Sequence, residues 1–284
     1  MKRNYIKKVI SLTLVMMMSV FVMPDIVSAG TPYPAGAQVT LNPNWLYANY
    51  SAINSGAAVY YAAGANRNGK IVAVNAGHGT VGGTKYKTYC HPDMTPKLTG
   101  GSTSAGAIKA TAVSGGMTFN DGTSESAVTL RAAQLFRDKL LAAGYDVLMI
   151  RDGANVNLDN VARTVISNNV ADCHIALHFD GDGLSYDKGC FYISTPEGLK
   201  TKTPVSSVWQ MHELLGTSLV NGLACVGTKV SGKGKMVVDL TQTSYSTIPS
   251  VDLELGNQCS NHSDAVLSNM ADGMVIGVNS FFGF

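Results

Sequence analysis

The clearest indication of the fold of this chain is the stretch Ile71-Val72-Ala73-Val74-Asn75-Ala76-Gly77-His78-Gly79. It begins as a short apolar run and ends in a histidine between two glycines. Two similar apolar runs, at 173–177 and 251–253, lead directly into His178 and Glu254. Apolar runs of this length, separated by longer helical patterns, predict buried parallel strands of an α/β domain.

The polar residues that follow these runs are expected to meet in space. Ligands of open α/β sheets bind at the carboxyl ends of the strands, so side chains from distant segments converge on one crevice there. His78, His178 and Glu254 would bring two imidazoles and a carboxylate to that edge. This donor set is typical of catalytic metal sites, and the sequence therefore predicts a metal-dependent hydrolase.

The remaining patterns complete a single α/β domain with a mostly parallel, mixed central sheet and helices on both faces. The clearest helix lies between Ser124, which can cap it, and Gly144, which can end it. Helical periodicity also predicts helices over 158–166, 205–223 and 262–280, and apolar runs predict strands over 145–150 and 189–194. No internal repeat interrupts this alternation.

The first residues are expected to be a secretory signal peptide. Basic residues at 2–8 precede an apolar stretch over 9–23, and small residues at 27–29 supply a cleavage site. We expect 1–29 to be removed, leaving a secreted or wall-associated protein without a stable membrane span. The formal net charge is +2 for the whole chain, and about −1 without this segment. No basic patch indicates a nucleic-acid partner.

Two segments lack a sustained apolar pattern. Residues 30–69 are expected to form an N-terminal leader packed on the domain, with a short helix over 51–63. Residues 80–124 are dense in Gly, Ser and Thr. A long irregular segment inside a compact domain is usually functional or disordered. Because this one begins beside His78 and ends beside Glu125, the functional interpretation is favoured.

Each candidate residue also has a purely structural explanation. Glu125 at the start of a helix would complement the helix dipole. Glu254 shares a strand face with Asp252, where a buried parallel strand should be apolar; because the next helix is expected to cover this strand, we favour a catalytic carboxylate. His174 lies about 13 Å along the strand from His178, too far to share one ion with it, and is interpreted as a core histidine.

The other polar residues are interpreted as mostly structural. His91 is taken as a solvated loop residue, and His212 and His262 have no evident partners. Asp180 is a candidate for orienting His178. The five cysteines show no CxxC spacing, so a zinc ribbon has no support; Cys173 and Cys190 are expected to be buried, and disulfide pairing stays open.

The order of several motifs resembles the zinc-dependent N-acetylmuramoyl-L-alanine amidases of bacterial cell walls. The resemblance covers 70–282. In chain order the matching residues are Gly77-His78-Gly79, Glu125 opening a helix, Gly144-x-x-Val147-x-x-x-Arg151, Arg163, Asn168, Ala171-Asp172, His178, Ile248-Pro249 and Glu254-Leu255-Gly256. The chain differs from the family pattern at His178-Phe179-Asp180, where His-x-Asn is usual, and after Gly256.

This resemblance implies an activity and a role for each residue. His78, Glu125 and His178 would bind Zn²⁺, and Glu254 would be the catalytic base. The reaction would be hydrolysis of the amide between N-acetylmuramic acid and L-Ala in peptidoglycan, carried out by a catalytic domain over 70–284.

Two alternatives stay open from the sequence. The same ligands suit another secreted zinc peptidase or a deacetylase. The unusual residues at 180 and 257–259 also allow a non-catalytic wall-binding protein on an amidase fold, although retention of all four site residues argues against decay. A serine or cysteine hydrolase is disfavoured, because no Gly-x-Ser-x-Gly motif is present. The oligomeric state and any activating partner are undetermined.

Overall fold

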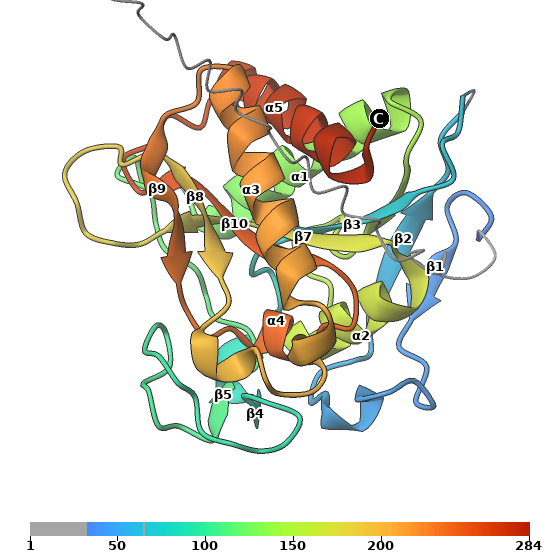
Figure 1. Ribbon diagram of the computed structural model, residues 1–284, viewed down its shortest axis with the longest axis vertical. Coiled ribbons are helices and arrows are strands. Elements are labelled where there is room, and N and C mark those ends of the chain that lie inside the picture. The colour runs from blue at the N-terminus through green and yellow to red at the C-terminus, as the bar shows by residue number, and fades with distance from the viewer. Residues whose placement is uncertain (1–32, 65) are drawn as a thin grey trace, which may run out of the picture.

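The computed structural model describes residues 33–64 and 66–284 of the chain (Figure 1). Its strands are β1 (Gln38–Thr40), β2 (Ala57–Tyr61), β3 (Ile71–Ala76), β4 (Lys87–Tyr89), β5 (Lys109–Thr111), β6 (Asp146–Met149), β7 (Cys173–Asp180), β8 (Cys190–Ser194), β9 (Val230–Val237) and β10 (Ser250–Asn257). Eight of them form one sheet in the order β1-β2-β6-β3-β7-β10-β8-β9, and β4 pairs with β5 in a separate hairpin.

The centre of the large sheet is parallel and its edges are mixed. β6, β3, β7 and β10 pair in parallel, whereas β2 and β8 run antiparallel to their central neighbours. The central strands are apolar because helices cover both faces. In the register between β7 and β10, His178 lies opposite Glu254. The predicted α/β fold with a mixed sheet is confirmed.

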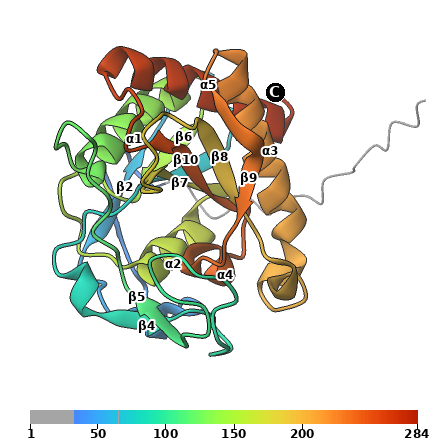
Figure 2. The same cartoon turned by 90° about the vertical axis from the view of Figure 1, so that its left-hand side faces the viewer.

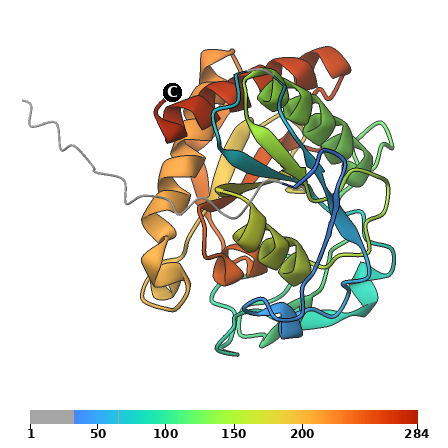
Figure 3. The same ribbon diagram turned by 90° about the vertical axis from the view of Figure 1, so that its right-hand side faces the viewer.

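Helices lie on both faces of this sheet. They are α1 (Glu125–Ala142), α2 (Asn160–Val170), α3 (Trp209–Cys225), α4 (Thr241–Tyr245) and α5 (Asp264–Phe282). In Figure 3 the green α1 and red α5 lie above the sheet and the olive α2 lies below it. None of the helices in the described part of the chain combines the length and the apolar character that a membrane span requires.

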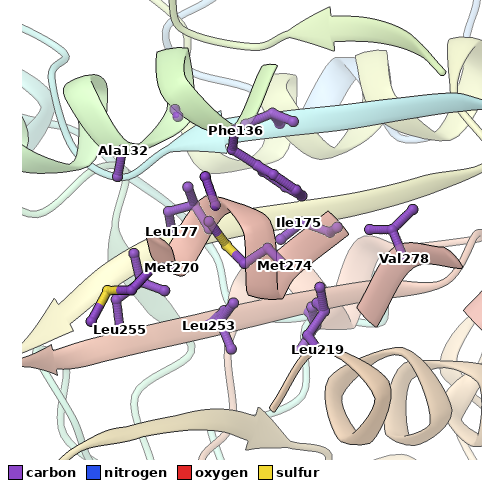
Figure 4. Close-up of a cluster of buried hydrophobic side chains, with 14 of the residues drawn as sticks. Ala132, Phe136, Ile175, Leu177, Leu219, Leu253, Leu255, Met270, Met274 and Val278 are labelled. Carbon is purple, nitrogen blue, oxygen red and sulfur yellow. The ribbon is translucent and has the colours of Figure 1, made fainter. Parts of the chain in front are cut away.

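The larger core lies between the sheet and α1, α3 and α5. Leu177 of β7 and Leu253 of β10 pack there against Phe136 of α1 and Met274 of α5 (Figure 4). A second core lies on the other face, beneath α2. β10 therefore alternates, with Val251, Leu253 and Leu255 toward the larger core and Asp252 and Glu254 toward the opposite face. The expectation that the following helix covers Glu254 is wrong, because α5 packs on the apolar side.

The helix expected over 51–63 is also wrong. Residues 57–61 form β2, which pairs antiparallel with β6. Ala58 and Tyr60 are buried while their neighbours are half-buried, which is the period of two of a strand. The β-branched and aromatic residues Val59, Tyr60 and Tyr61 favour that conformation. The segment over 30–69 thus supplies two strands at the edge of the sheet. The expected signal peptide lies outside the described residues.

The best helix begins and ends where the sequence predicts. Ser124 occupies the N-cap position of α1, although its side chain makes no capping hydrogen bond. Gly144 follows the helix with φ of 91°, a left-handed conformation that glycine adopts without steric cost. The irregular segment 80–124 contains the β4–β5 hairpin, which lies in Figure 2 at the end of the molecule near α2 and α4.

Two buried histidines make the stability of this fold depend on pH. Burial lowers the pKa of His174 to about 3 and that of His212 to about 4. The unfolded chain takes up these protons near pH 6.5, so between about pH 6.5 and 4 the unfolded state binds more protons than the folded state. The contribution of these two histidines to the free energy of unfolding therefore decreases as the pH is lowered through this window, by about 3 kcal/mol between pH 6.5 and 5.

Urea denaturation at these two pH values measures the change. A His212→Asn variant removes one of these two titrating groups, so its free energy of unfolding should change by about 1.5 kcal/mol less than that of wild type between the two pH values. An unchanged pH dependence in that variant would mean that other groups cause it.

Candidate functional site

His78 lies at the end of β3 in a tight, crowded turn. Its φ of 64° is unusual for a residue with a side chain. The flanking glycines are required by space: a Cβ at Gly77 would lie 2.4 Å from the His178 ring, and one at Gly79 would lie 2.6 Å from the Arg151 guanidinium. The Gly-His-Gly sequence therefore lets two metal-ligand candidates and a buried arginine approach one another.

Two buried arginines hold this turn. Arg151 donates to the carbonyls of Ala76 and Gly77, and Arg163 donates to the carbonyls of Ala76 and His78. Both guanidinium groups are at most 1% exposed, and neither has a carboxylate within 4.0 Å in the part of the chain that the structure describes. Their charge is directed at the backbone that presents His78, which keeps the strained turn in one conformation.

Glu125 is the first residue of α1 and is 3% exposed. Its Oε2 accepts a hydrogen bond from the Met117 amide at 2.8 Å, and its Oε1 accepts one from the Phe179 amide at 3.0 Å. These two bonds fix the carboxylate between the irregular segment and the end of β7. Glu125 therefore does more than complement the dipole of α1, because its Oε1 also contacts both candidate histidines.

The two imidazoles and this carboxylate meet at one point. Glu125 Oε1 lies 2.8 Å from His78 Nε2 and 3.1 Å from His178 Nδ1, and the two ring nitrogens are 3.1 Å apart. The other nitrogen of His78, Nδ1, lies 3.0 Å from the carbonyl oxygen of Ser114. The Ser114 hydroxyl lies 3.1 Å from the same nitrogen. A proton on Nδ1, donated to the carbonyl, would leave the Nε2 lone pair facing the cluster. Metal-binding histidines commonly have such a backbone partner.

Two more carboxylates approach the cluster from β10. Asp252 Oδ2 lies 3.7 Å from His178 Nε2. Asp252 Oδ1 and Glu254 Oε2 are buried and have no hydrogen-bond partner among the described residues. Unpaired buried carboxylate oxygens are costly, so these two atoms are free for a ligand, a proton or a solvent molecule in the cavity.

The charges of these groups shift one another's pKa values. Burial alone would raise the pKa of Glu125, but hydrogen bonds from His178 and His78 lower it well below its usual range. Burial opposes protonation of His178, yet the charges of Asp252 and Glu125 raise its pKa to about 10. Burial, and then the charge of Asp252, raises the pKa of Glu254. Each shift reflects negative charge concentrated where little water reaches it.

All four predicted site residues line one cavity of ≈ 600 Å³. His78, Glu125, His178 and Glu254 share it with Asp252. The cavity lies on the face of the sheet opposite the larger core, at the carboxyl ends of β3, β7 and β10. Its volume is in the range of ordinary small-molecule sites. The structure thus brings together the four residues that the sequence singled out.

Several contacts differ from the sequence predictions. Asp180 forms an ion pair with Lys188 and is not the carboxylate that approaches His178. Asp252, two residues before Glu254 on the same face of β10, is the carboxylate that approaches His178. His91 is not solvated, since it is 2% exposed and its Nε2 lies 3.0 Å from both carboxylate oxygens of Asp239. The alternation along β10 already signalled Asp252, whereas nothing in the local sequence signalled the partner of His91.

The remaining polar residues have structural partners. His212 accepts a hydrogen bond from the Ser250 amide, and His262 Nε2 lies 3.1 Å from Asp121. Cys173 and Cys190 are buried, as expected, and all five cysteines of the chain are free.

This fold, with a cluster of two histidines and a glutamate at the carboxyl edge of the sheet, is typical of hydrolytic enzymes with a metal site. The sequence model of the N-acetylmuramoyl-L-alanine amidase family matches residues 72–275. The chain belongs to this family of hydrolases, which act on peptidoglycan of the cell wall.

Solved structures share the fold. The N-acetylmuramyl-L-alanine amidase Ami1 from Mycobacterium smegmatis is 19% identical, with a TM-score of 0.64 over 77% of this chain and 99% of that chain. Ami1 from Mycobacterium abscessus is 20% identical, with a TM-score of 0.61 over 75% and 99%. The CwlD amidase from Clostridioides difficile, solved with the GerS lipoprotein, is 18% identical, with a TM-score of 0.53 over 75% and 98%. No curated protein matches the chain.

Proposed function

We propose that the protein hydrolyses the amide between the lactyl group of N-acetylmuramic acid and L-Ala in peptidoglycan, and that it depends on zinc. The observation that supports this best is the contact of His78, Glu125 and His178 at one point in a chain of the amidase family. Two histidines and one carboxylate are a common ligand set of catalytic zinc, which leaves a further position open.

The donor atoms fit one shared ion. Ligand atoms about 2 Å from a zinc ion lie at most about 4 Å from one another, and the three separations here are 2.8, 3.1 and 3.1 Å. The Ser114 carbonyl beside His78 Nδ1 favours the tautomer that leaves Nε2 available for the ion. His78 Nε2, His178 Nδ1 and Glu125 Oε1 would hold the ion.

Zinc bound there would supply Lewis-acid activation of the amide carbonyl and of a water molecule. Glu254 would take the proton from the attacking water, since its Oε2 has no hydrogen-bond partner among the described residues. The same carboxyl group would then deliver the proton to the departing amine of L-Ala. Asp252, near His178 Nε2, would favour the tautomer with the proton on Nε2, which leaves Nδ1 free for the ion and keeps the ring oriented.

The expected location follows from this activity, and we propose that the enzyme is secreted and acts on the cell wall. We also propose that 70–284 form the catalytic domain, and that 30–69 pack on it through β1 and β2. Peptidoglycan is the proposed partner.

Analysis of the products that the protein releases from purified peptidoglycan tests the reaction. The expected result is a new free amino group on L-Ala and an intact disaccharide. Released terminal amino acids would indicate a peptidase, released acetate a deacetylase, and unchanged wall material a binding protein. Chelation of metal should abolish hydrolysis, and addition of zinc should restore it. Activity that survives complete removal of metal would contradict the zinc dependence.

A further inference from the structure

Two attachments of the irregular segment 80–124, here called the insertion, to the rest of the molecule bear on the cavity. Its C-terminal end holds the metal-ligand candidates: the Ser114 carbonyl accepts from His78, and the Met117 amide donates to Glu125. Gly116 packs so closely there that a Cβ would lie 2.8 Å from the His78 ring. This end of the insertion is therefore part of the candidate metal centre.

The other attachment is Asp239, which lies between β9 and α4 and is fully buried. Its carboxylate accepts from His91 Nε2 at 3.0 Å and from the Leu98 amide at 2.6 Å. Its own amide donates to Thr99 Oγ1 at 2.8 Å, and its carbonyl oxygen accepts from Lys97 Nζ. Asp239 thus bonds the insertion through both backbone and side chain, so this part of the insertion is a fixed wall.

Lys97 presents a cation on this wall. It lines the same ≈ 600 Å³ cavity as the metal-ligand candidates, and it is only 7% exposed. An ammonium group has three N–H donors, and one of them donates to the Asp239 carbonyl. Within the described residues, no carboxylate oxygen lies within 4.0 Å of Lys97 Nζ.

The nearby carboxylate does not satisfy Lys97 directly. The oxygens of Asp239 are already bonded to His91 and to the Leu98 amide. Burial lowers the pKa of the Lys97 ammonium, and the charge of Asp239 only partly opposes this. A buried cation that lacks a direct ionic partner is costly, and an anion that enters the cavity would supply one.

We propose that Lys97 binds a carboxylate of the peptide part of the substrate, so that the wall formed by the insertion receives the stem peptide. This inference rests on the proposed amidase function and adds the orientation of the substrate. The N-acetylated sugars carry no ionised group once the lactyl carboxyl is in the scissile amide, whereas the peptide keeps free carboxylates. Other groups of the insertion in this cavity are neutral, among them Ser102, Thr103 and Thr111.

Matched substrates test this proposal. The substrates are synthetic muramyl peptides in pairs, which differ only in having a carboxylate or a carboxamide at one of the free positions. KM and kcat are measured for each pair with the zinc-loaded full chain and with its Lys97→Met variant. At the peptide position that Lys97 binds, the variant should have a KM for the carboxylate substrate about 10- to 100-fold higher than wild type. Its kcat should be nearly unchanged, because Lys97 contacts the carboxylate equally in the bound substrate and in the transition state. The matching carboxamide should be hydrolysed equally by both proteins.

Two further variants control this experiment. Lys85→Met removes the same charge from an exposed residue of the insertion and should change neither substrate. Lys97→Arg keeps a cation and should restore most of the preference for the carboxylate. An equal loss of both substrates in Lys97→Met, or no loss of either, overturns the proposal.

Binding of the released peptide separates this inference from the amidase function. By calorimetry, the wild-type protein should bind the free peptide with the carboxylate at least 10-fold more tightly than its carboxamide, and Lys97→Met should lose this difference. The comparison of the two peptides with the wild-type protein requires neither hydrolysis of a substrate nor a correctly folded variant. If the protein binds the carboxylate selectively but cleaves no wall material, the amidase function fails while the anion site stands; equal binding of both peptides rejects the site.

Discussion

Glu254→Gln is expected to lower kcat for peptidoglycan hydrolysis by about 10²- to 10⁴-fold while leaving the zinc content unchanged. The substitution keeps the shape of the side chain but removes the group that can accept a proton. Glu254 is not one of the three residues whose donor atoms meet, so the metal should still bind. Initial rates on purified peptidoglycan and the zinc-to-protein ratio of the same sample measure both effects.

A neighbouring acid provides the control. Asp180→Asn also removes a carboxylate from the cavity, but Asp180 is bound to Lys188 and does not contact the candidate ligands. We expect its rate to stay within a few-fold of wild type. Full activity of Glu254→Gln with normal zinc would show that another group is the base.

Asp252 is the group that would then take its place. Its Oδ1 is buried and has no hydrogen-bond partner in the part of the chain that the structure describes, and its Oδ2 lies 3.7 Å from His178 Nε2. If Asp252→Asn, rather than Glu254→Gln, lost the catalytic step at normal zinc content, the two carboxylates of β10 would exchange roles.

His178→Ala is expected to abolish the stabilisation that zinc gives to the folded protein. At about 100 times its dissociation constant, a metal that binds only the folded chain adds about 2.7 kcal/mol, which corresponds to a rise in Tm of about 5–10 °C for a domain of this size. The wild-type protein should show this rise when zinc is added after chelation. The variant should show none, because one of three ligands is missing.

His174 offers a matched control on the same strand. It is fully buried, and it is not part of the His78, Glu125 and His178 cluster. His174→Asn should lower Tm, yet addition of zinc should raise Tm as much as in wild type. If His178→Ala still responded to zinc like wild type, the assigned ligand set would be wrong.

The grouping of the site residues at one edge of the sheet is predictable, because it depends on the spacing of apolar residues along the chain. The apolar runs before His78 and His178 predicted parallel strands, and parallel strands place their carboxyl ends at one edge. The alternation of Asp252 and Glu254 with leucine and valine predicted a polar strand face. The amidase motifs then selected Glu125, which by itself also fits a residue that only complements the helix dipole.

Other features depend on partners that are distant in the sequence. The short run of alanine and tyrosine in β2 fits the period of a helix as well as that of a strand, and pairing with β6 decides between them. The local sequence predicts a solvated loop position for His91, because its partner, Asp239, is 148 positions away. The side of the sheet on which α5 packs, and hence what covers Glu254, depends on how the helices share the core.

The order of residues is enough to predict which side chains follow the central strands, and therefore which edge of the sheet holds two imidazoles and the carboxylates. This prediction is possible because strand periodicity and chain direction are local properties. Long-range packing establishes which oxygen faces which ring nitrogen, that two arginines fix the His78 turn, and that the insertion is bonded to Asp239 with Lys97 in the cavity. Those contacts join segments far apart in the chain, and their formation depends on the packing of the whole domain.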